Sequence, residues 1–381
     1  MPTADHPTSQ PTSGPQPASG PIPSLDGIRA LSVALVFFSH NGLGDIVPGG
    51  LGVTIFFVLS GFLITTLMRE EFAERGDVSF RAFYLRRLLR LTPPLFIVTA
   101  LAVALSLGTG LGDPFSAGGL ASVLFYFSNY FQMAHGIHLQ PPGLGVTWSL
   151  AVEEHYYLLY PPLALALLRF GRRGFSALTL AVLCVLILAW RCWLVLHGAP
   201  EDHLNMSTDT RVDAILVGCL LAMIRNPWLD PVPPPSRKAD VGFAALCVTL
   251  LVASLVWRSE FFRLTLRYTV QSAAIAGLLY LAVARARQAP YRWLNRRPMV
   301  YLGAVSYTIY LAHYLVLLWA DVHVGVYGRL AVTLVTLTLT LAIAALMRQF
   351  VENPCAQLRR RLHRSFVAGR PRVSGAVSEQ P

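Results

Sequence analysis

Arg29 and His40 stand in an otherwise apolar stretch, LDGIRALSVALVFFSH (residues 25–40), that predicts the first membrane-crossing helix. They are 11 positions apart, which is about three helical turns and about 16.5 Å of rise. Eleven steps of about 100° return to within about 20° of the starting direction, so both side chains lie on one helix face. Ionisable groups at membrane depth are costly and commonly face a bundle interior or a wet cavity. The pair therefore predicts a functional site, unless Arg29 sits at the headgroup boundary and His40 merely caps the helix.

The composition places the chain in a membrane. Of its 381 residues, 54% are hydrophobic and 13% are charged, whereas ordinary globular proteins carry about 25% charged residues. The net charge of +11 comes almost entirely from Arg, in short clusters between apolar runs. That distribution is typical of cytoplasmic loops and excludes a nucleic-acid-binding protein. Candidate apolar segments lie near residues 28–44, 50–68, 94–112, 117–134, 148–168, 175–197, 211–225, 240–257, 266–284, 300–319 and 328–350.

The arginine clusters decide how many of these segments cross. If every cluster is cytoplasmic, each interval between clusters contains an even number of crossings. The interval from Arg90 to Arg169 contains three segments, so one of them does not cross. Segment 117–134 carries Ser128, Asn129 and Gln132, and we predict that it re-enters or lies at the outer interface and roofs the site. The fold class is therefore an all-α polytopic bundle of about ten transmembrane helices in the cell (inner or plasma) membrane, with both termini cytoplasmic.

Three segments follow along the chain. Residues 1–24, rich in Pro, Ser, Thr and Gly, predict a disordered tail. Residues 25–355 form the membrane domain, and residues 356–381 predict a basic, disordered cytoplasmic tail. The five cysteines are scattered and read as packing residues. His135 and His138 lack a convincing third ligand, so we expect no metal site.

A second motif, FYLRRLLRLTPP (residues 83–94), contains Arg87 and Arg90 three positions apart, ahead of a helix-breaking pair of prolines. Guanidinium groups offer planar, bidentate donors that suit a phosphate. The alternative is that both are ordinary topology-setting arginines.

Two further motifs carry ionisable groups at a depth similar to that of His40. In TWSLAVEEHYYLLYPP, Glu153 or Glu154 can orient an imidazole and stabilise its charged form, although adjacent residues diverge and at most one faces the bundle. The alternative is an interfacial carboxylate facing water. In SYTIYLAHY, His313 is a candidate second proton carrier, while stripes of this kind more often serve helix packing.

These motifs, together with GVTIFFVLSGFLIT and FVENP, resemble the acyltransferase 3 family of integral membrane O-acyltransferases, in the family's order, over about residues 25–355. The resemblance implies ten membrane helices and transfer of an acyl group, commonly acetyl, from acyl-CoA. It also implies a hydroxyl acceptor, on a surface carbohydrate or on a glycosylated metabolite such as a macrolide antibiotic. The family's functional pair falls on Arg29 and His40, and its RxxR motif on Arg87 and Arg90. Thr54 and His155 depart from the common family residues, Asp and Gln.

The resemblance leads to a mechanistic hypothesis. Arg87 and Arg90, with Arg29 above them, bind the CoA phosphates at the cytoplasmic mouth. His40 removes the proton of the acceptor hydroxyl and Glu153 or Glu154 orients it; a covalent acyl-His40 intermediate fits the sequence equally well. The competing class is a transporter or flippase, since buried Arg, His and Glu also mark transport paths. A structural scaffold in a surface-polymer assembly is the third alternative.

Overall fold

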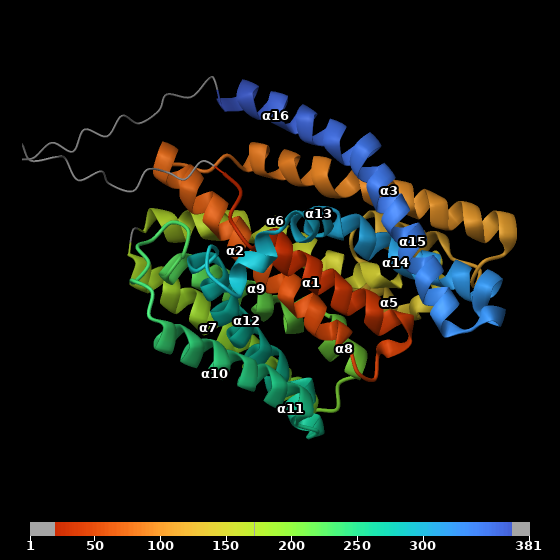
Figure 1. Ribbon diagram of the computed structural model, residues 1–381, viewed down its shortest axis with the longest axis horizontal. Coiled ribbons are helices and arrows are strands. Elements are labelled where there is room, and N and C mark those ends of the chain that lie inside the picture. Colours follow the sequence, from red (N-terminus) through yellow and green to blue (C-terminus); the bar gives the residue numbers. More distant parts are fainter. Residues whose placement is uncertain (1–19, 171, 368–381) are drawn as a thin grey trace, which may run out of the picture.

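The computed structural model describes residues 20–170 and 172–367, and these residues form helices and connecting loops without a strand (Figure 1). The long helices follow the apolar runs of the sequence. They are α1 (Leu25–Phe38), α2 (Gly49–Arg75), α3 (Phe80–Thr109), α6 (Trp148–Arg169), α7 (Arg173–Leu196), α9 (Thr208–Ile224), α10 (Arg237–Val256), α12 (Leu266–Ala284), α14 (Ser306–Val324) and α15 (Arg329–Met347).

Short helices join or extend the long ones. They are η1 (Ser39–Leu43), α4 (Ala117–Leu124), α5 (Ser128–His135), η2 (Ile137–Leu139), η3 (Leu144–Thr147), α8 (Glu201–Met206), α11 (Glu260–Leu264), η4 (Tyr291–Asn295), α13 (Arg297–Ala304), η5 (Gly325–Tyr327), η6 (Arg348–Glu352) and α16 (Asn353–Val367).

Within the described residues, 7 helices are long and apolar enough to cross a membrane: α2, α3, α7, α10, α12, α14 and α15. This confirms the predicted all-α membrane bundle. The other three long helices are α1, α6 and α9; α1 has 14 residues before its π-helical extension and α9 has 17. That α1, α6 and α9 also cross the membrane, which would give ten crossings, therefore stays a prediction.

Segment 117–134 does not form a crossing helix. It folds as α4 and α5, which have 8 residues each, or about 12 Å of rise, well short of the hydrocarbon thickness of about 30 Å. Asn129 and Gln132 of α5 are buried, and Gln132 lines the cavity that contains His40. Gln132 thus lies at the cavity of His40, and the role of segment 117–134 as a roof over an active site stays a prediction.

Glycines bring α2 and α9 into close contact. A Cβ atom at Gly61 would lie 1.9 Å from the Ile215 carbonyl oxygen, and one at Gly218 would lie 2.0 Å from the Val58 carbonyl oxygen. Small residues at such positions let membrane helices approach closely, which replaces the missing hydrophobic driving force with packing. The close approach of α2 and α9 therefore depends on Gly61 and Gly218.

A buried ion pair ties α7 to α9. Arg191 Nη2 lies 2.6 Å from Asp213 Oδ2, and both side chains are fully buried. Arg191 also donates to the Thr210 and Thr265 carbonyls, and Asp213 accepts from the Thr269 hydroxyl at 3.0 Å. Buried charges are tolerated when they are paired and hydrogen-bonded in this way.

The sequence analysis placed the start of the disordered C-terminal tail too early in the chain. Residues 356–367 belong to α16, which packs beside α3 at the edge of the bundle (Figure 1). Residues 1–19 and 368–381, where the predicted disorder mainly falls, lie outside the described residues. The prediction of a disordered segment from residue 356 was wrong for residues 356–367.

Candidate active site

Three cavities lie in a row along α2. Gly49, Gly50 and Val53 at its start line a cavity of about 560 Å³ that also contains His40, which we call the histidine cavity. Ser60 and other residues in the middle of α2 line a small cavity of about 70 Å³, which we call the arginine cavity. The end of α2, from Leu67 to Arg75, lines a vestibule of about 420 Å³. Neighbouring cavities share lining residues: Arg87 and Arg90 line both the arginine cavity and the vestibule, and Tyr310 lines both the arginine cavity and the histidine cavity.

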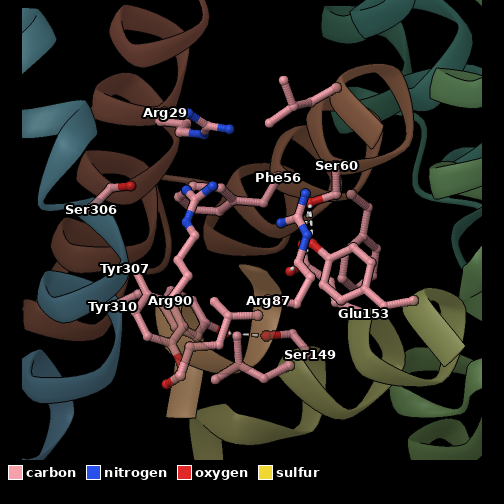
Figure 2. A pocket seen from close by; sticks show the side chains of 15 residues that line it. Arg29, Phe56, Ser60, Arg87, Arg90, Ser149, Glu153, Ser306, Tyr307 and Tyr310 are labelled. Carbon is pink, nitrogen blue, oxygen red and sulfur yellow. Dashed lines mark hydrogen bonds between the residues drawn. The ribbon is translucent and has the colours of Figure 1, made fainter. Parts of the chain in front are cut away.

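The arginine cavity gathers the three predicted arginines (Figure 2). Arg29 reaches it from α1, and Arg87 and Arg90 reach it from α3. Arg29 is paired with Asp26 on its own helix at 2.8 Å, and its side chain is 15% exposed. Among the described residues, Arg87 and Arg90 have no carboxylate within ion-pair distance; the Arg87 guanidinium lies over the Tyr157 ring, 4.7 Å from its centroid. Such guanidiniums suit a polyanion.

Arg87 and Arg90 also line the vestibule, so they stand between the two cavities. The vestibule is lined by three further arginines, Arg75, Arg86 and Arg359, the last of them from α16. Three acidic residues, Glu70, Glu71 and Glu74, line the vestibule as well, and Glu71 is paired with Arg75 and Arg86 at 3.5 and 3.3 Å. The vestibule is therefore a charged entrance that leads to the two unpaired guanidiniums.

Glu153 lies in the arginine cavity and is held by hydroxyl groups. Ser60 Oγ donates to Glu153 Oε1 at 2.8 Å, and the Tyr157 hydroxyl donates to Glu153 Oε2 at 3.2 Å (Figure 2). Glu154 points elsewhere, into a side cavity with Tyr84 and Tyr126. The two carboxylates diverge, as adjacent helical positions require.

His40 lines the histidine cavity, and its ring is paired with the imidazole of His313. His40 stands in the π-helical turn η1 at the end of α1 and is exposed, whereas His313 on α14 is fully buried. His40 Nδ1 lies 2.8 Å from His313 Nε2, and the ring planes are 17° apart. Trp148, Tyr310 and Tyr314 contribute aromatic walls to the same cavity. The exposed imidazole thus faces an aromatic space that is large enough for a small polar ligand.

Comparison with known proteins identifies the family. Residues 22–348 match the acyltransferase domain family. The chain belongs to this family. It is 30% identical over 359 residues to the peptidoglycan O-acetyltransferase OatA of Listeria monocytogenes, covering 87% of this chain and 55% of that protein. It is 28% identical over 365 residues to the O-acetyltransferase OatA of Staphylococcus aureus, covering 87% and 57%. The chain thus spans little more than half the length of these relatives, and no solved structure matches it significantly.

Arg29 and His40, expected about three turns apart on one helix face, line the arginine cavity and the histidine cavity respectively. In the described part of the chain, the hydrogen-bond partner of the His40 ring is His313 rather than Glu153 or Glu154. The hypothesis that one of these carboxylates orients His40 is wrong in its geometry, because Glu153 is bound to Ser60 and Tyr157 and Glu154 faces a different cavity.

Several residues of the site escaped the sequence analysis. Ser60 lies in the motif GVTIFFVLSGFLIT, and its hydroxyl binds Glu153. Tyr157 follows Glu153 by four positions, and this helical spacing was a usable signal. His155 binds the Thr208 hydroxyl at 2.7 Å, which is a helix-to-helix contact. Within the described ranges, no group of three or more His, Cys, Asp or Glu side chains could hold a metal ion.

Proposed function

We propose that this chain is a membrane O-acyltransferase that moves an acetyl-type group from acyl-CoA to a hydroxyl of a cell-wall carbohydrate. Membership of the acyltransferase domain family supports the reaction class. The names of the relatives, peptidoglycan O-acetyltransferase and O-acetyltransferase, support an acetyl group and favour a peptidoglycan-type acceptor over a glycosylated antibiotic. A transporter is disfavoured by the same family membership.

The observation that carries the proposal is the row of cavities with unpaired arginines towards one end and His40 at the other. Arg87 and Arg90 suit the phosphates of CoA, because a guanidinium binds phosphate oxygens bidentately. The arginine clusters favour a cytoplasmic vestibule and cytoplasmic termini. A donor bound there extends its thioester arm through the arginine cavity towards the histidine cavity, where the acceptor enters.

His40 acts as the general base in this proposal. It accepts the proton of the acceptor hydroxyl while the hydroxyl oxygen forms an ester bond to the acyl carbon. The carbon–sulfur bond breaks, and His40 returns the proton to the leaving thiolate. A positioned base contributes about 10²–10⁴-fold to a rate. The aromatic walls at Trp148, Tyr310 and Tyr314 would hold a sugar ring against the base. An acyl-His40 intermediate uses the same atoms in two steps.

Acyl-CoA-dependent labelling of membranes tests the proposal. Membranes carrying the wild-type chain, Arg87→Ala or His40→Ala are incubated with acetyl-CoA labelled in the acetyl group, with peptidoglycan fragments or a polysaccharide extract as acceptor. We expect one added acetyl group by mass spectrometry, lost with His40→Ala and strongly reduced with Arg87→Ala. Arg172→Ala and His323→Ala, which change exposed residues outside the three cavities, serve as matched controls.

The outcomes separate the alternatives. Wild-type acetylation by both Arg87→Ala and His40→Ala would place the site elsewhere. If no acceptor pool yields a CoA-dependent product, transport becomes the better reading. Acetyl transfer to a glycosylated small molecule but not to peptidoglycan fragments would keep the enzyme class and overturn the proposed acceptor.

A further inference from the structure

The two ring nitrogens of His313 have partners of different kinds. Nδ1 lies 2.7 Å from the Tyr310 carbonyl oxygen and 3.2 Å from the Ile309 carbonyl oxygen. Nε2 lies 2.8 Å from His40 Nδ1. The ring is fully buried, so these contacts account for both of its polar atoms. The contacts therefore decide where the protons reside.

A backbone carbonyl can only accept a hydrogen bond, so Nδ1 of His313 carries the proton. The aromatic rings around it are those of Phe37, His40, Tyr310 and Tyr314, and among the described residues no carboxylate lies within ion-pair or hydrogen-bond distance of the His313 ring. A buried cation without a counter-charge is costly, so the neutral imidazole is favoured. In a neutral ring with its proton on Nδ1, Nε2 holds a lone pair and accepts.

The same reasoning fixes His40. Because His313 Nε2 accepts, His40 Nδ1 donates and carries the proton of the neutral His40 ring. The lone pair of His40 is then on Nε2, the nitrogen that His313 does not occupy. His40 lines the histidine cavity, so this lone pair is the one available to an acceptor hydroxyl. His313 thus selects the tautomer that a base needs.

We propose that His313 is a positioning residue that holds His40 as the Nδ1–H tautomer and stabilises its imidazolium form during acyl transfer. This inference rests on the proposed function, in which His40 is the base. When Nε2 of His40 gains a proton, its Nδ1–H becomes a charged donor, and the bond to His313 Nε2 strengthens. The bond is then worth more in the transition state than in the ground state, which is the condition for a contribution to the rate.

This role differs from that of a second proton carrier. A carrier passes its proton onward, and His313 Nδ1 faces only the carbonyl oxygens of Tyr310 and Ile309. A carbonyl does not take up a proton, so the chain of transfers ends at His313 among the described residues. His313 therefore orients and stabilises His40 without relaying its proton.

Two substitutions separate positioning from bulk packing. In His313→Gln the amide oxygen can occupy the place of Nε2 and accept from His40, whereas His313→Leu fills the space without an acceptor. We expect His313→Leu to lower kcat by about 10²-fold or more, with KM for acetyl-CoA unchanged. We expect His313→Gln to recover at least a tenth of the wild-type kcat. His323→Leu, an exposed histidine on the same helix, is the matched control and should retain wild-type kcat.

A spectroscopic readout keeps the inference independent of activity. Purified protein labelled with ¹⁵N-histidine is compared with His40→Gln to assign His40 among the 10 histidines. We expect protonated Nδ1 and unprotonated Nε2 in the wild type and in His313→Gln, and a mixed or reversed state in His313→Leu. A proton on Nε2 of His40 in the wild type, or wild-type kcat in His313→Leu, would overturn the inference. If the wild type has the expected tautomer and transfers no acyl group, the proposed function fails while the pairing of the two rings stands.

Discussion

The hydroxyl of Tyr310 lies 2.7 Å from the hydroxyl of Ser149 in the arginine cavity (Figure 2). The Tyr310 hydroxyl also lies 3.0 Å from the Val146 carbonyl oxygen, and its ring lines both cavities. Phe56 meets this ring edge-on, with ring centroids 6.1 Å apart. An acyl group that passes from one cavity to the other must therefore pass these aromatic rings.

The aromatic rings where the two cavities meet predict a short acyl group. Phe56 and Tyr310 pack edge to face there, so a longer acyl chain at this point would have to displace one of them. We expect Phe56→Ala to raise the ratio of butyryl to acetyl transfer about tenfold, the scale that a methylene group contributes in an apolar pocket. Competition between the two acyl-CoA donors, read by mass spectrometry, measures the ratio. Phe96→Ala, which changes an exposed residue of α3, is the control. An unchanged ratio in Phe56→Ala would mean that Phe56 does not limit the length of the acyl chain.

Replacing Arg87 or Arg90 by lysine tests bidentate phosphate binding. Lysine keeps the charge and loses the planar pair of donors, and at Arg87 it also loses the contact with the Tyr157 ring. We expect KM for acetyl-CoA to rise about tenfold in each variant, with kcat changing less. Initial rates over a range of donor concentrations give both constants. Arg172→Lys should leave KM unchanged, and an unchanged KM in both test variants would contradict a role in donor binding.

Glu153 balances the charge of the arginine cavity. It lines the cavity with Arg29, Arg87 and Arg90, and hydroxyl donors from Ser60 and Tyr157 hold it in place. Glu153→Gln keeps the shape and removes the negative charge, so we expect free CoA to bind about tenfold more tightly. Product inhibition by CoA measures this affinity. Weaker CoA binding in Glu153→Gln would instead mean that the carboxylate organises the site through its hydrogen bonds.

The sequence predicted the local structure of this chain better than its contacts. Apolar runs located the helices, and the even number of crossings required between arginine clusters singled out segment 117–134. Both signals are local and depend on the surrounding membrane. The convergence of Arg29 with Arg87 and Arg90 was also expected. The pairing of His40 with His313 was not expected, because these residues are 273 positions apart and the sequence of a helix does not specify which helix packs against it. The predicted link between His40 and a glutamate failed for the same reason: depth in the membrane does not specify direction.

The close contact of α2 and α9 makes the bundle sensitive at Gly61. A Cβ atom there would lie 1.9 Å from the Ile215 carbonyl oxygen, so the helices must separate to admit it. We expect Gly61→Ala to destabilise the protein by about 1–3 kcal/mol. Gly242→Ala is the matched control, because a Cβ atom at Gly242 of α10 meets nothing within 4 Å. Thermal unfolding in detergent compares the two; equal stability would mean that α2 and α9 tolerate a wider spacing.

The loop that follows α9 contains a pH-dependent contact. Asp230 accepts two hydrogen bonds from Arg69 of α2, at 2.8 and 3.1 Å, and one from the Asn226 amide at 2.8 Å. Burial alone would raise the pKa of Asp230, but these hydrogen bonds and the nearby charges of Arg69 and Arg173 outweigh it and lower the pKa below its ordinary value. The ionised carboxylate is therefore favoured by folding.

A lowered pKa in the folded state means that the unfolded chain binds a proton more readily. The contact consequently stabilises the protein fully above the ordinary pKa of about 3.9 and loses this effect as the pH falls through the lowered value. We expect Asp230→Asn to cost about 3 kcal/mol at pH 7, because it leaves Arg69 without its carboxylate. Thermal unfolding of both proteins from neutral pH to the lowest pH that the detergent permits should show the two transitions converging in acid. If the difference in unfolding temperature stays constant down to that pH, the charge of Asp230 does not contribute to the stability of the folded protein.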